Sequence, residues 1–356
     1  MPTESMTPRE RWQAVLDRKP PDRVPMDIWA TGEAMAKLKR HLGVETRDEV
    51  CRKLRIDAPL NTGPRYAGPP PAEGEDIWGC RHRDVSYEGG VYSECVHNPL
   101  AAFESVDEIE ASYRWPDPDW WDYSGIAAHV AEATRAEDRP IRAGGSEPFL
   151  TYCELRGQEQ GYMDLVLNPE MVHYCLDKLF DLAYEQTRRI YEALPNKVMI
   201  SYVAEDLGSQ NDLLFSLAHI REFLLPRMKR MMDLVHSAGA YVFTHSDGSI
   251  RKVIPDLIEI GMDVLNPIQW RCAGMERDAL KREFGETICF HGGMDNQQTL
   301  AFGTVEDVRQ EVADNLRILG EGGGYIIAPC HNIQAVSPPE NVVAMFEAGY
   351  ELGWTV

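Results

Sequence analysis

Short apolar runs recur along the chain after about residue 139, and each of them ends abruptly in polar residues. Such runs, rich in β-branched and aromatic residues, are typical of strands buried on both faces of a parallel sheet. The predicted strands of this kind are Pro140–Gly144, Val198–Ala204, Ala240–Thr244, Asp263–Asn266, Thr287–Phe290 and Tyr325–Ala328.

Segments with helical spacing of apolar residues lie between these runs. They are Asn168–Ala193, Leu217–Ala238, Ile250–Ile260, Arg277–Phe284, Thr304–Leu319 and Pro339–Leu352. Strands that alternate with helices predict parallel βαβ units. With Val24–Trp29 and a weaker strand at Ile56–Asn61, the pattern gives eight β–α units and predicts a (β/α)₈ TIM barrel. A doubly wound open sheet is the alternative, but no G-x-G-x-x-G follows any of these strands.

The N-terminal region predicts a helical extension of this barrel. Thr7 suits an N-cap, Pro8 the first helical position and Glu10 the third residue of a capping box. Pro20 and Pro21 end that helix, and residues 31–54 have helical spacing again.

Residues 60–125 differ in character from the rest of the chain. Residues 63–74 are rich in Gly and Pro, and Val85–Val96 predicts a hairpin that turns at Gly89-Gly90. The stretch has too little periodic apolar sequence for a core of its own. We therefore expect one domain over residues 1–356, with an insertion at about 60–125.

The charge balance restricts the partners of this protein. Its net charge is −21 at pH 7, so its surface repels phosphate backbones and anionic lipids and argues against nucleic-acid or membrane partners. No apolar run approaches the roughly 20 residues that span a bilayer. The N-terminus lacks the pattern of a signal peptide, and the eight cysteines include no C-x-x-C pair. We expect a cytoplasmic protein with reduced cysteines.

Polar residues gather directly after the predicted strands. In a barrel the carboxyl ends of parallel strands share one rim, so these residues would line one mouth and bind a small-molecule substrate. The alternative is that loops are polar wherever they occur. The candidate substrate-binding residues at this rim are Glu147, Gln210, Asn266, Gln269, His291, Asp295 and His331.

Three of the rim residues have the chemistry of a metal site. His245, Asp247 and Cys330 offer one nitrogen, one oxygen and one sulfur, which zinc accepts in sites with an open position. At i and i+2 of an extended segment, His245 and Asp247 point to the same side. Alternatively, His245 hydrogen-bonds a substrate and Cys330 is a small apolar strand residue.

Acid–base chemistry has four candidates at the same rim. Glu205 and Asp206 are consecutive, so we expect only one of them to point inward. Either could serve as general acid, general base or ligand to a substrate amine, beside His245 and Asp247. The alternative is that one of the two carboxylates caps the helix that follows.

Several motifs together resemble those of the uroporphyrinogen decarboxylase superfamily, over essentially the whole chain. They are Thr7-Pro-Arg-Glu-Arg-Trp12, Pro21-Asp-Arg-Val-Pro25, Phe223–Lys229, His245-Ser-Asp-Gly248, Gly261–Pro267, Gly292-Gly-Met-Asp295 and Gly322–Pro329. The resemblance implies a (β/α)₈ barrel with its site at the carboxyl rim, and it implies a homodimer.

Two chemistries occur in that superfamily. Its decarboxylases carry an arginine-rich motif, Met-Arg-Gln-Ala-Gly-Arg, that grips the many carboxylates of the substrate. This chain has Asp27-Ile-Trp-Ala-Thr-Gly32 after the first strand, without arginine. The second branch comprises cobamide-dependent methyltransferases, whose thiol-specific members hold zinc with His-x-Cys and a distant Cys. In this chain His245 and Cys330 match that pattern, and Asp247 stands in place of the first Cys.

The resemblance therefore implies methyl transfer between a corrinoid protein and a small molecule. Relatives that methylate tetrahydrofolate assist protonation at an amine, a task that suits Asp206, Asp247 and His245. Methylcobalamin would be carried by the partner, since no Asp-x-His-x-x-Gly corrinoid motif occurs here. A metal-dependent lyase or decarboxylase with a non-porphyrin substrate is one alternative. A non-catalytic barrel that senses a corrinoid or folate is another.

Overall fold

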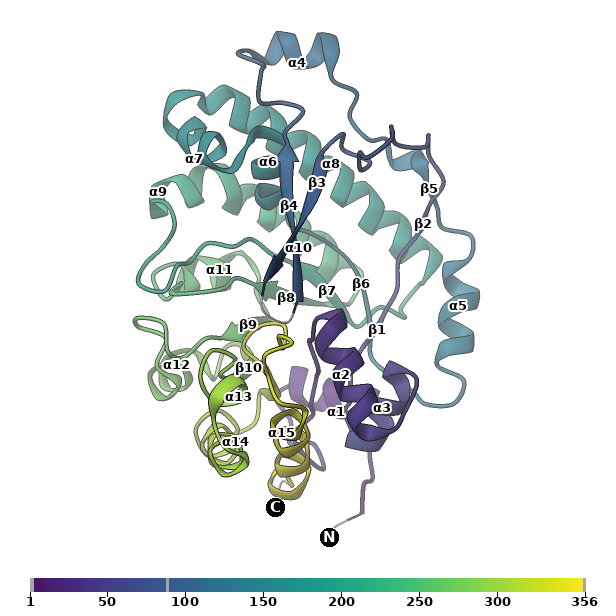
Figure 1. The fold of residues 1–356 in the computed structure, drawn as a ribbon, viewed down its shortest axis with the longest axis vertical. Coiled ribbons are helices and arrows are strands. Elements are labelled where there is room, and N and C mark those ends of the chain that lie inside the picture. The colour runs from purple at the N-terminus through teal and green to yellow at the C-terminus, as the bar shows by residue number, and fades with distance from the viewer. Residues whose placement is uncertain (1–2, 88–89, 355–356) are drawn as a thin grey trace.

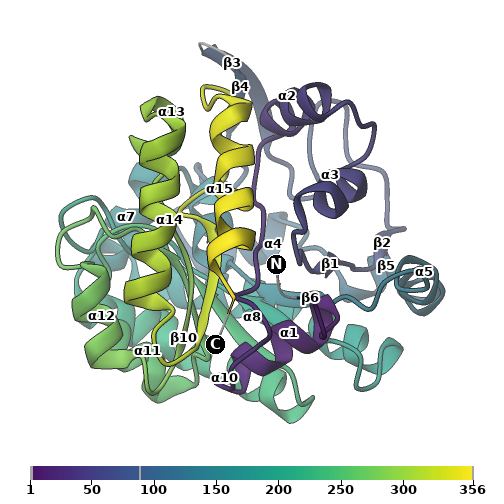
Figure 2. The same ribbon diagram turned by 90° about the horizontal axis from the view of Figure 1, so that it is seen from below.

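A seven-stranded parallel sheet forms the centre of the protein (Figures 1 and 2). The computed structural model describes residues 3–87 and 90–354. The strand order is β1-β6-β7-β8-β9-β10-β11, so each strand pairs with its neighbour along the chain apart from the insertion. These strands are β1 (Leu60–Asn61), β6 (Ile141–Ser146), β7 (Ile200–Val203), β8 (Tyr241–His245), β9 (Val264–Ile268), β10 (Cys289–Met294) and β11 (Tyr325–Pro329).

The sheet curves into a partial barrel, and the predicted strand Val24–Trp29 is not a regular strand within the described residues. It runs beside β11 through isolated parallel bridges, Met26 with Ile327 and Ala30 with Ile333. On its other side the Asp57 N–H donates to the Met26 carbonyl at 2.8 Å. Pro25 has no N–H for a ladder, and the carboxylate of Asp57 takes the Met26 N–H. The predicted parallel α/β architecture is confirmed. Within the described residues, however, the sheet has seven regular strands and is not closed by an eighth.

Helices surround the sheet largely as the sequence predicts. The capping box at Thr7 begins α1 (Pro8–Leu16), and residues 31–54 form α2 (Gly32–Leu42) and α3 (Arg47–Leu54). The segment 217–238 contains a π-helical turn, η2 (Ile220–Leu224), between α9 (Leu217–His219) and α10 (Leu225–Ser237). The other predicted helices are α8 (Pro169–Ala193), α11 (Ile254–Ile260), α12 (Arg277–Phe284), α14 (Val305–Leu319) and α15 (Pro339–Leu352).

Some helices have no counterpart in the sequence prediction. Two of them, α6 (Pro148–Arg156) and α7 (Gln158–Leu167), follow β6 directly, and α13 (Thr299–Phe302) follows β10. Apolar residues on α6 and α7 face both the core and the solvent: Tyr152 is buried, but Val166 is 68% exposed. A one-sided apolar stripe is therefore missing, which hides both helices from a periodicity search.

The insertion is an excursion from the sheet, as predicted. Its hairpin pairs β3 (Arg81–Tyr87) with β4 (Gly90–His97), while Glu88 and Gly89 of the predicted turn lie outside the described residues. Its remaining elements are the antiparallel pair β2 (Arg65–Tyr66) and β5 (Trp121–Asp122), α4 (Val106–Ser112), η1 (Pro118–Trp120) and, just beyond it, α5 (Ile126–Ala133).

Helix α1 covers the end of the sheet opposite the β3–β4 hairpin (Figure 2). Its fully buried Trp12 packs with Ile200, Phe243 and Ile326, which come from three different strands. With that end filled by side chains, the carboxyl ends of the strands remain as the place for a site. Among the described residues, no helix combines the length and apolar character needed to cross a membrane. All eight cysteines are free thiols.

Candidate active site

Three side chains at the carboxyl ends of β7 and β8 converge on one point. His245 is the last residue of β8, and its Nε2 lies 3.7 Å from Asp206 Oδ1 and 3.9 Å from Asp247 Oδ1. One nitrogen and two oxygens of this cluster lie within 4.8 Å of one another. The two carboxylates are partly exposed, whereas the imidazole is nearly buried. The cluster therefore offers a cation a half-open site.

Cys330 lies outside this cluster, so the structure groups His245 and Asp247 of the predicted ligand set with Asp206, and Cys330 stays a predicted ligand. Its Sγ donates to the carbonyl oxygen of Ile268 at 2.9 Å, and burial raises the pKa of the thiol well above its usual value. Asp206 takes the third place because β7 and β8 are neighbouring strands.

A hydrogen-bond chain leads from His245 into the interior. Oδ1 of Asn266 lies 2.7 Å from Nδ1 of His245, and Nδ2 of Asn266 lies 2.7 Å from Nδ1 of His291. His291 Nε2 in turn lies 3.2 Å from Asp27 Oδ2. Asn266 and His291 are buried beneath the cluster and contact each other, and their substrate-binding role stays a prediction.

Only one of the consecutive carboxylates Glu205 and Asp206 faces His245. Glu205 is buried and turns instead to the N-terminus of α6, where the Phe149 N–H donates to it at 3.0 Å. Burial, together with the charges of Glu147 and Asp206, raises the pKa of Glu205 well above its usual value despite that hydrogen bond. Glu205 is thus a buried support of the site. It contacts the start of α6, which precedes it in the chain, and not the helix that follows, which the alternative from the sequence named.

Glu147 and Asp247 hold their protons to higher pH than ordinary carboxyls. Burial, aided by the charges of Asp206 and Asp247 and opposed by His245, raises the pKa of Glu147 to about 7. Burial also raises the pKa of Asp247, although His245 and His331 act in the opposite direction. A carboxyl that titrates near neutrality can deliver or accept a proton at physiological pH.

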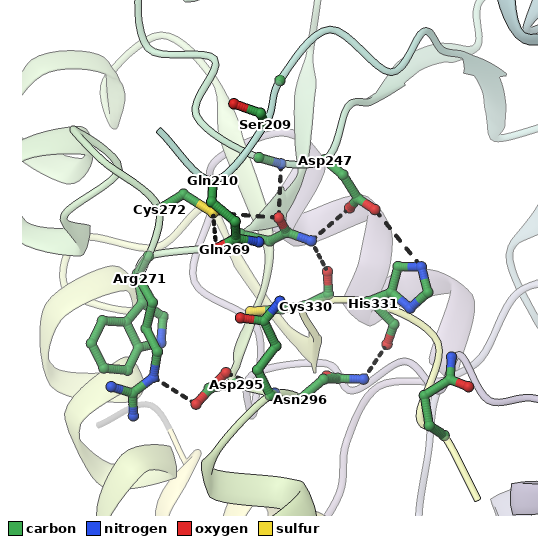
Figure 3. A pocket seen from close by; sticks show the side chains of 15 residues that line it. Ser209, Gln210, Asp247, Gln269, Arg271, Cys272, Asp295, Asn296, Cys330 and His331 are labelled. Carbon is green, nitrogen blue, oxygen red and sulfur yellow. Dashed lines mark hydrogen bonds and ion pairs between the residues drawn. The ribbon is translucent and has the colours of Figure 1, made fainter. Parts of the chain in front are cut away.

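A cavity of about 550 Å³ opens beside Asp247 at the ends of β8–β11 (Figure 3). The Gln269 amide donates to Asp247 Oδ1 at 2.8 Å and to the Cys330 carbonyl at 3.1 Å, which orients the aspartate toward the cavity. Nε2 of His331 lies 3.8 Å from Asp247 on the other side. The lining includes six of the predicted site residues: Gln210, Asp247, Gln269, Asp295, Cys330 and His331.

The side chains that line this cavity are mostly neutral or negatively charged. Arg271 is the one lining residue with a fixed positive charge in the described part of the chain, and its Nε lies 2.6 Å from Asp295 Oδ2. The carboxylate of Asp295 also accepts from backbone N–H groups at the start of α13. Asp295 is therefore fully engaged with the protein, and the cavity has no unpaired guanidinium for an anionic ligand.

Residues 84–352 match the uroporphyrinogen decarboxylase family, URO-D. The chain belongs to this family. It is 25% identical over 270 residues to a uroporphyrinogen decarboxylase of Psychromonas ingrahamii, covering 72% of this chain and 71% of the relative. A Chromohalobacter salexigens relative of the same name is 24% identical, covering 96% and 97%.

Among solved structures, the enzyme of the URO-D family described here is similar in fold to a methyltransferase from Methanosarcina mazei. The TM-score is 0.67 at 19% sequence identity, and the similarity covers 98% of this chain and 99% of the other. The likeness extends to the partial barrel and its helices, and at this identity it concerns the fold.

Aromatic residues around the imidazole complete the site of this URO-D family member, and the sequence search missed their role. Trp29 stacks on His245 with ring centroids 5.7 Å apart and a 22° interplanar angle, and Tyr202 lies 5.6 Å away. Tyr202 is inside β7, and Trp29 ends the segment Val24–Trp29, two residues after Asp27. The two rings cover the imidazole side of the cluster.

We expect Glu205→Gln to fold with a loss of stability below about 1 kcal/mol, because a glutamine oxygen can accept the same N–H as a protonated carboxyl. A carboxyl with a raised folded pKa contributes stability at low pH that is lost as pH rises from the unfolded pKa toward the folded one. As the pH rises above about 5, the free energy of unfolding should therefore fall less in Glu205→Gln than in the wild-type protein. Chemical denaturation at several pH values tests this, with Glu205→Ala as the contrast expected to lose about 2 kcal/mol or more. Equal pH slopes in wild type and Glu205→Gln would contradict the assignment.

Proposed function

We propose that this protein is a corrinoid-dependent methyltransferase that moves a methyl group between a corrinoid protein and a small molecule. That small molecule is tetrahydrofolate or a methylated compound. The observation that carries the proposal is the cluster of Asp206, His245 and Asp247 beside Glu147, a carboxyl that titrates near pH 7. Such a site combines cation binding with proton supply at one point.

The donor set of this cluster suits a divalent metal ion. One imidazole nitrogen and two carboxylate oxygens within 4.8 Å leave a position open for a ligand. Compared with a thiolate-rich site, the oxygen donors favour a harder ion, so zinc would bind more weakly here. When bound, such an ion would supply Lewis-acid stabilisation of negative charge on a ligand atom.

The residues of this chain handle a proton in methyl transfer. When a methyl group leaves a nitrogen, the electrons of the broken C–N bond remain on that nitrogen, which must gain a proton. Protonated Glu147 or Asp247 can donate it, and in the reverse direction the carboxylate takes the proton back. Trp29 and Tyr202 limit water on the imidazole side of this site.

The charge of the site supports this reaction over porphyrinogen decarboxylation. A substrate with many carboxylates requires several fixed cations for recognition. The cavity offers Arg271, which is paired with Asp295, and the neighbouring cluster is acidic. Repulsion would oppose such a substrate.

The same proposal includes the parts that surround the site. We take Val24–Trp29 as the eighth position of a (β/α)₈ barrel, whose mouth receives the methylcobalamin of a partner corrinoid protein. A cytoplasmic homodimer is the expected form of the enzyme, in keeping with the reduced cysteines.

The expected result is that purified protein demethylates methylcobalamin under anaerobic conditions when tetrahydrofolate is added. Absorption spectra measure the loss of methylcobalamin, and mass spectrometry measures methyltetrahydrofolate. Asp233→Ala, an exposed variant on α10, serves as the active control because Asp233 pairs with exposed Lys229. Absence of turnover with folates and thiols alike, in either direction, contradicts the proposal.

A metal-dependent lyase is the second candidate, favoured by the oxygen-rich cluster, which could hold an ion that polarises a substrate carbonyl. Metal analysis of the purified protein tests it. A content below about a tenth of an equivalent per chain argues against any metal-dependent lyase. Retention of a corrinoid or folate without turnover would instead indicate a binding protein.

A further inference from the structure

Asp27 accepts hydrogen bonds on both of its carboxylate oxygens at the buried end of the chain that leads to His245. The Ile28 N–H donates to Oδ1 at 2.8 Å, and Nε1 of Trp29 donates to Oδ2 at 2.9 Å. Burial acts to raise its pKa, but the hydrogen bond from His291 and the charge of Arg142, 3.9 Å away, prevail and lower it. Asp27 is therefore a carboxylate and can only accept.

The acceptor character of Asp27 fixes the proton on His291. Nε2 of His291 lies 3.2 Å from Asp27 Oδ2, so this nitrogen carries the hydrogen. His291 is fully buried, and burial lowers its pKa, so the ring is neutral and holds one N–H only. Its Nδ1 must then accept, and the group that faces it at 2.7 Å is the Asn266 amide nitrogen. The amide orientation of Asn266 follows from this pair.

The orientation of Asn266 in turn fixes His245. With Nδ2 directed at His291, Oδ1 of Asn266 faces His245 Nδ1 at 2.7 Å and accepts its N–H. We infer that Asp27, His291 and Asn266 form a positioning relay that places the hydrogen of His245 on Nδ1 and directs its Nε2 lone pair toward Asp206 and Asp247. The inference concerns the site of the proposed function and specifies how that site is assembled.

The relay decides what the cluster can bind. Three lone-pair-bearing atoms meet at the cluster when Asp247 is ionised: Nε2 of His245, Oδ1 of Asp206, which accepts the Asp247 N–H at 3.2 Å, and Oδ1 of Asp247, which accepts the Gln269 amide at 2.8 Å. Acceptors at such distances repel one another unless a cation or a donor lies between them. Outer hydrogen bonds of this kind commonly orient metal-binding histidines and strengthen their basicity. The relay thus assigns a cation, a metal ion first of all, to this position.

The tautomers can be measured without any ligand. Two-bond proton–nitrogen NMR spectra of protein labelled with ¹⁵N-histidine distinguish Nδ1–H from Nε2–H rings, and His245→Gln and His291→Gln assign the signals. Metal-free wild-type protein, at a pH where its histidines are neutral, is expected to show His245 as Nδ1–H and His291 as Nε2–H. An Nε2–H ring at His245 would overturn the relay.

Variants test the consequence for cation binding. Asn266→Leu removes the amide of the relay, and zinc affinity is expected to fall about 10- to 100-fold. Asn315→Leu is the matched control because Asn315 is an equally buried amide that binds the Gly293 carbonyl and Met294 Sδ outside the relay. Its zinc affinity should stay within about twofold of wild type. Unchanged zinc affinity in Asn266→Leu, with both variants folded, also contradicts the relay.

The two proposals fail in different ways. Suppose that methyl transfer is absent, that His245 is the Nδ1–H tautomer and that Asn266→Leu weakens zinc binding. The proposed function is then wrong and the relay stands. If methyl transfer occurs with His245 as the Nε2–H tautomer, the relay is wrong and the function stands. The NMR spectra decide the relay even if wild-type protein binds no zinc.

Discussion

Replacing Asp247 with alanine is expected to lower kcat/KM for methyl transfer by about 10²- to 10⁴-fold, the usual range for losing a proton-handling group. Asp247 faces His245 at 3.9 Å and His331 at 3.8 Å, and it receives the Gln269 amide at 2.8 Å. Its removal takes one acceptor from the cluster and leaves the Gln269 amide with the Cys330 carbonyl as its remaining acceptor. Zinc affinity should fall by at least about tenfold in the same variant.

Asp247→Cys separates the two roles of this position. A thiolate is a softer ligand than a carboxylate, so zinc should bind more tightly to Asp247→Cys than to wild-type protein. Both Asp247→Ala and Asp247→Cys lack the carboxyl that would transfer a proton. Low turnover of Asp247→Cys together with tight zinc binding therefore identifies a proton-transfer role for Asp247. Restored turnover identifies a ligand role. Wild-type turnover and wild-type zinc affinity in Asp247→Ala would contradict both roles.

Glu147→Gln is expected to remove an ionisation near pH 7 from the pH profile of kcat/KM. The wild-type carboxyl, with a pKa of about 7, is protonated below that pH and charged above it. In the direction in which the methyl group leaves a nitrogen, measured with methyltetrahydrofolate and reduced cobalamin, the protonated carboxyl is the donor, so kcat/KM should fall about tenfold per pH unit above pH 7. In the glutamine variant this decline disappears, and the plateau lies about 10²- to 10⁴-fold lower.

Glu137→Gln is the matched control for Glu147→Gln. Burial raises the pKa of the Glu137 carboxyl as well, but the charges that act on it are those of Arg139, Asp57, Asp48 and Arg52 and not that of His245. Its pH profile should coincide with that of the wild type. A wild-type profile without an ionisation near pH 7, or a Glu147→Gln profile that keeps it, would exclude Glu147 as the proton donor.

Local sequence signals predicted most of the fold. The capping box at Thr7, the hairpin of the insertion and the alternation of strands and helices depend on contacts between near neighbours in the chain. Two features escaped this search because tertiary contacts set them. Helices α6 and α7 lack a one-sided apolar stripe, and Val24–Trp29 pairs through isolated bridges while Asp57 takes one of its N–H groups.

The sequence by itself determined which residues end the strands, and hence that His245, Asp206 and Asp247 would meet at one rim. Strand alternation is a local property, and parallel strands present their carboxyl ends together. Only the tertiary structure decided how neighbouring side chains divide their tasks. Glu205 turns to the N-terminus of α6, Cys330 donates to Ile268, and Asn266 and His291 lie beneath the cluster. These choices depend on hydrogen-bond partners from distant parts of the chain, and spacing along the sequence carries no record of them.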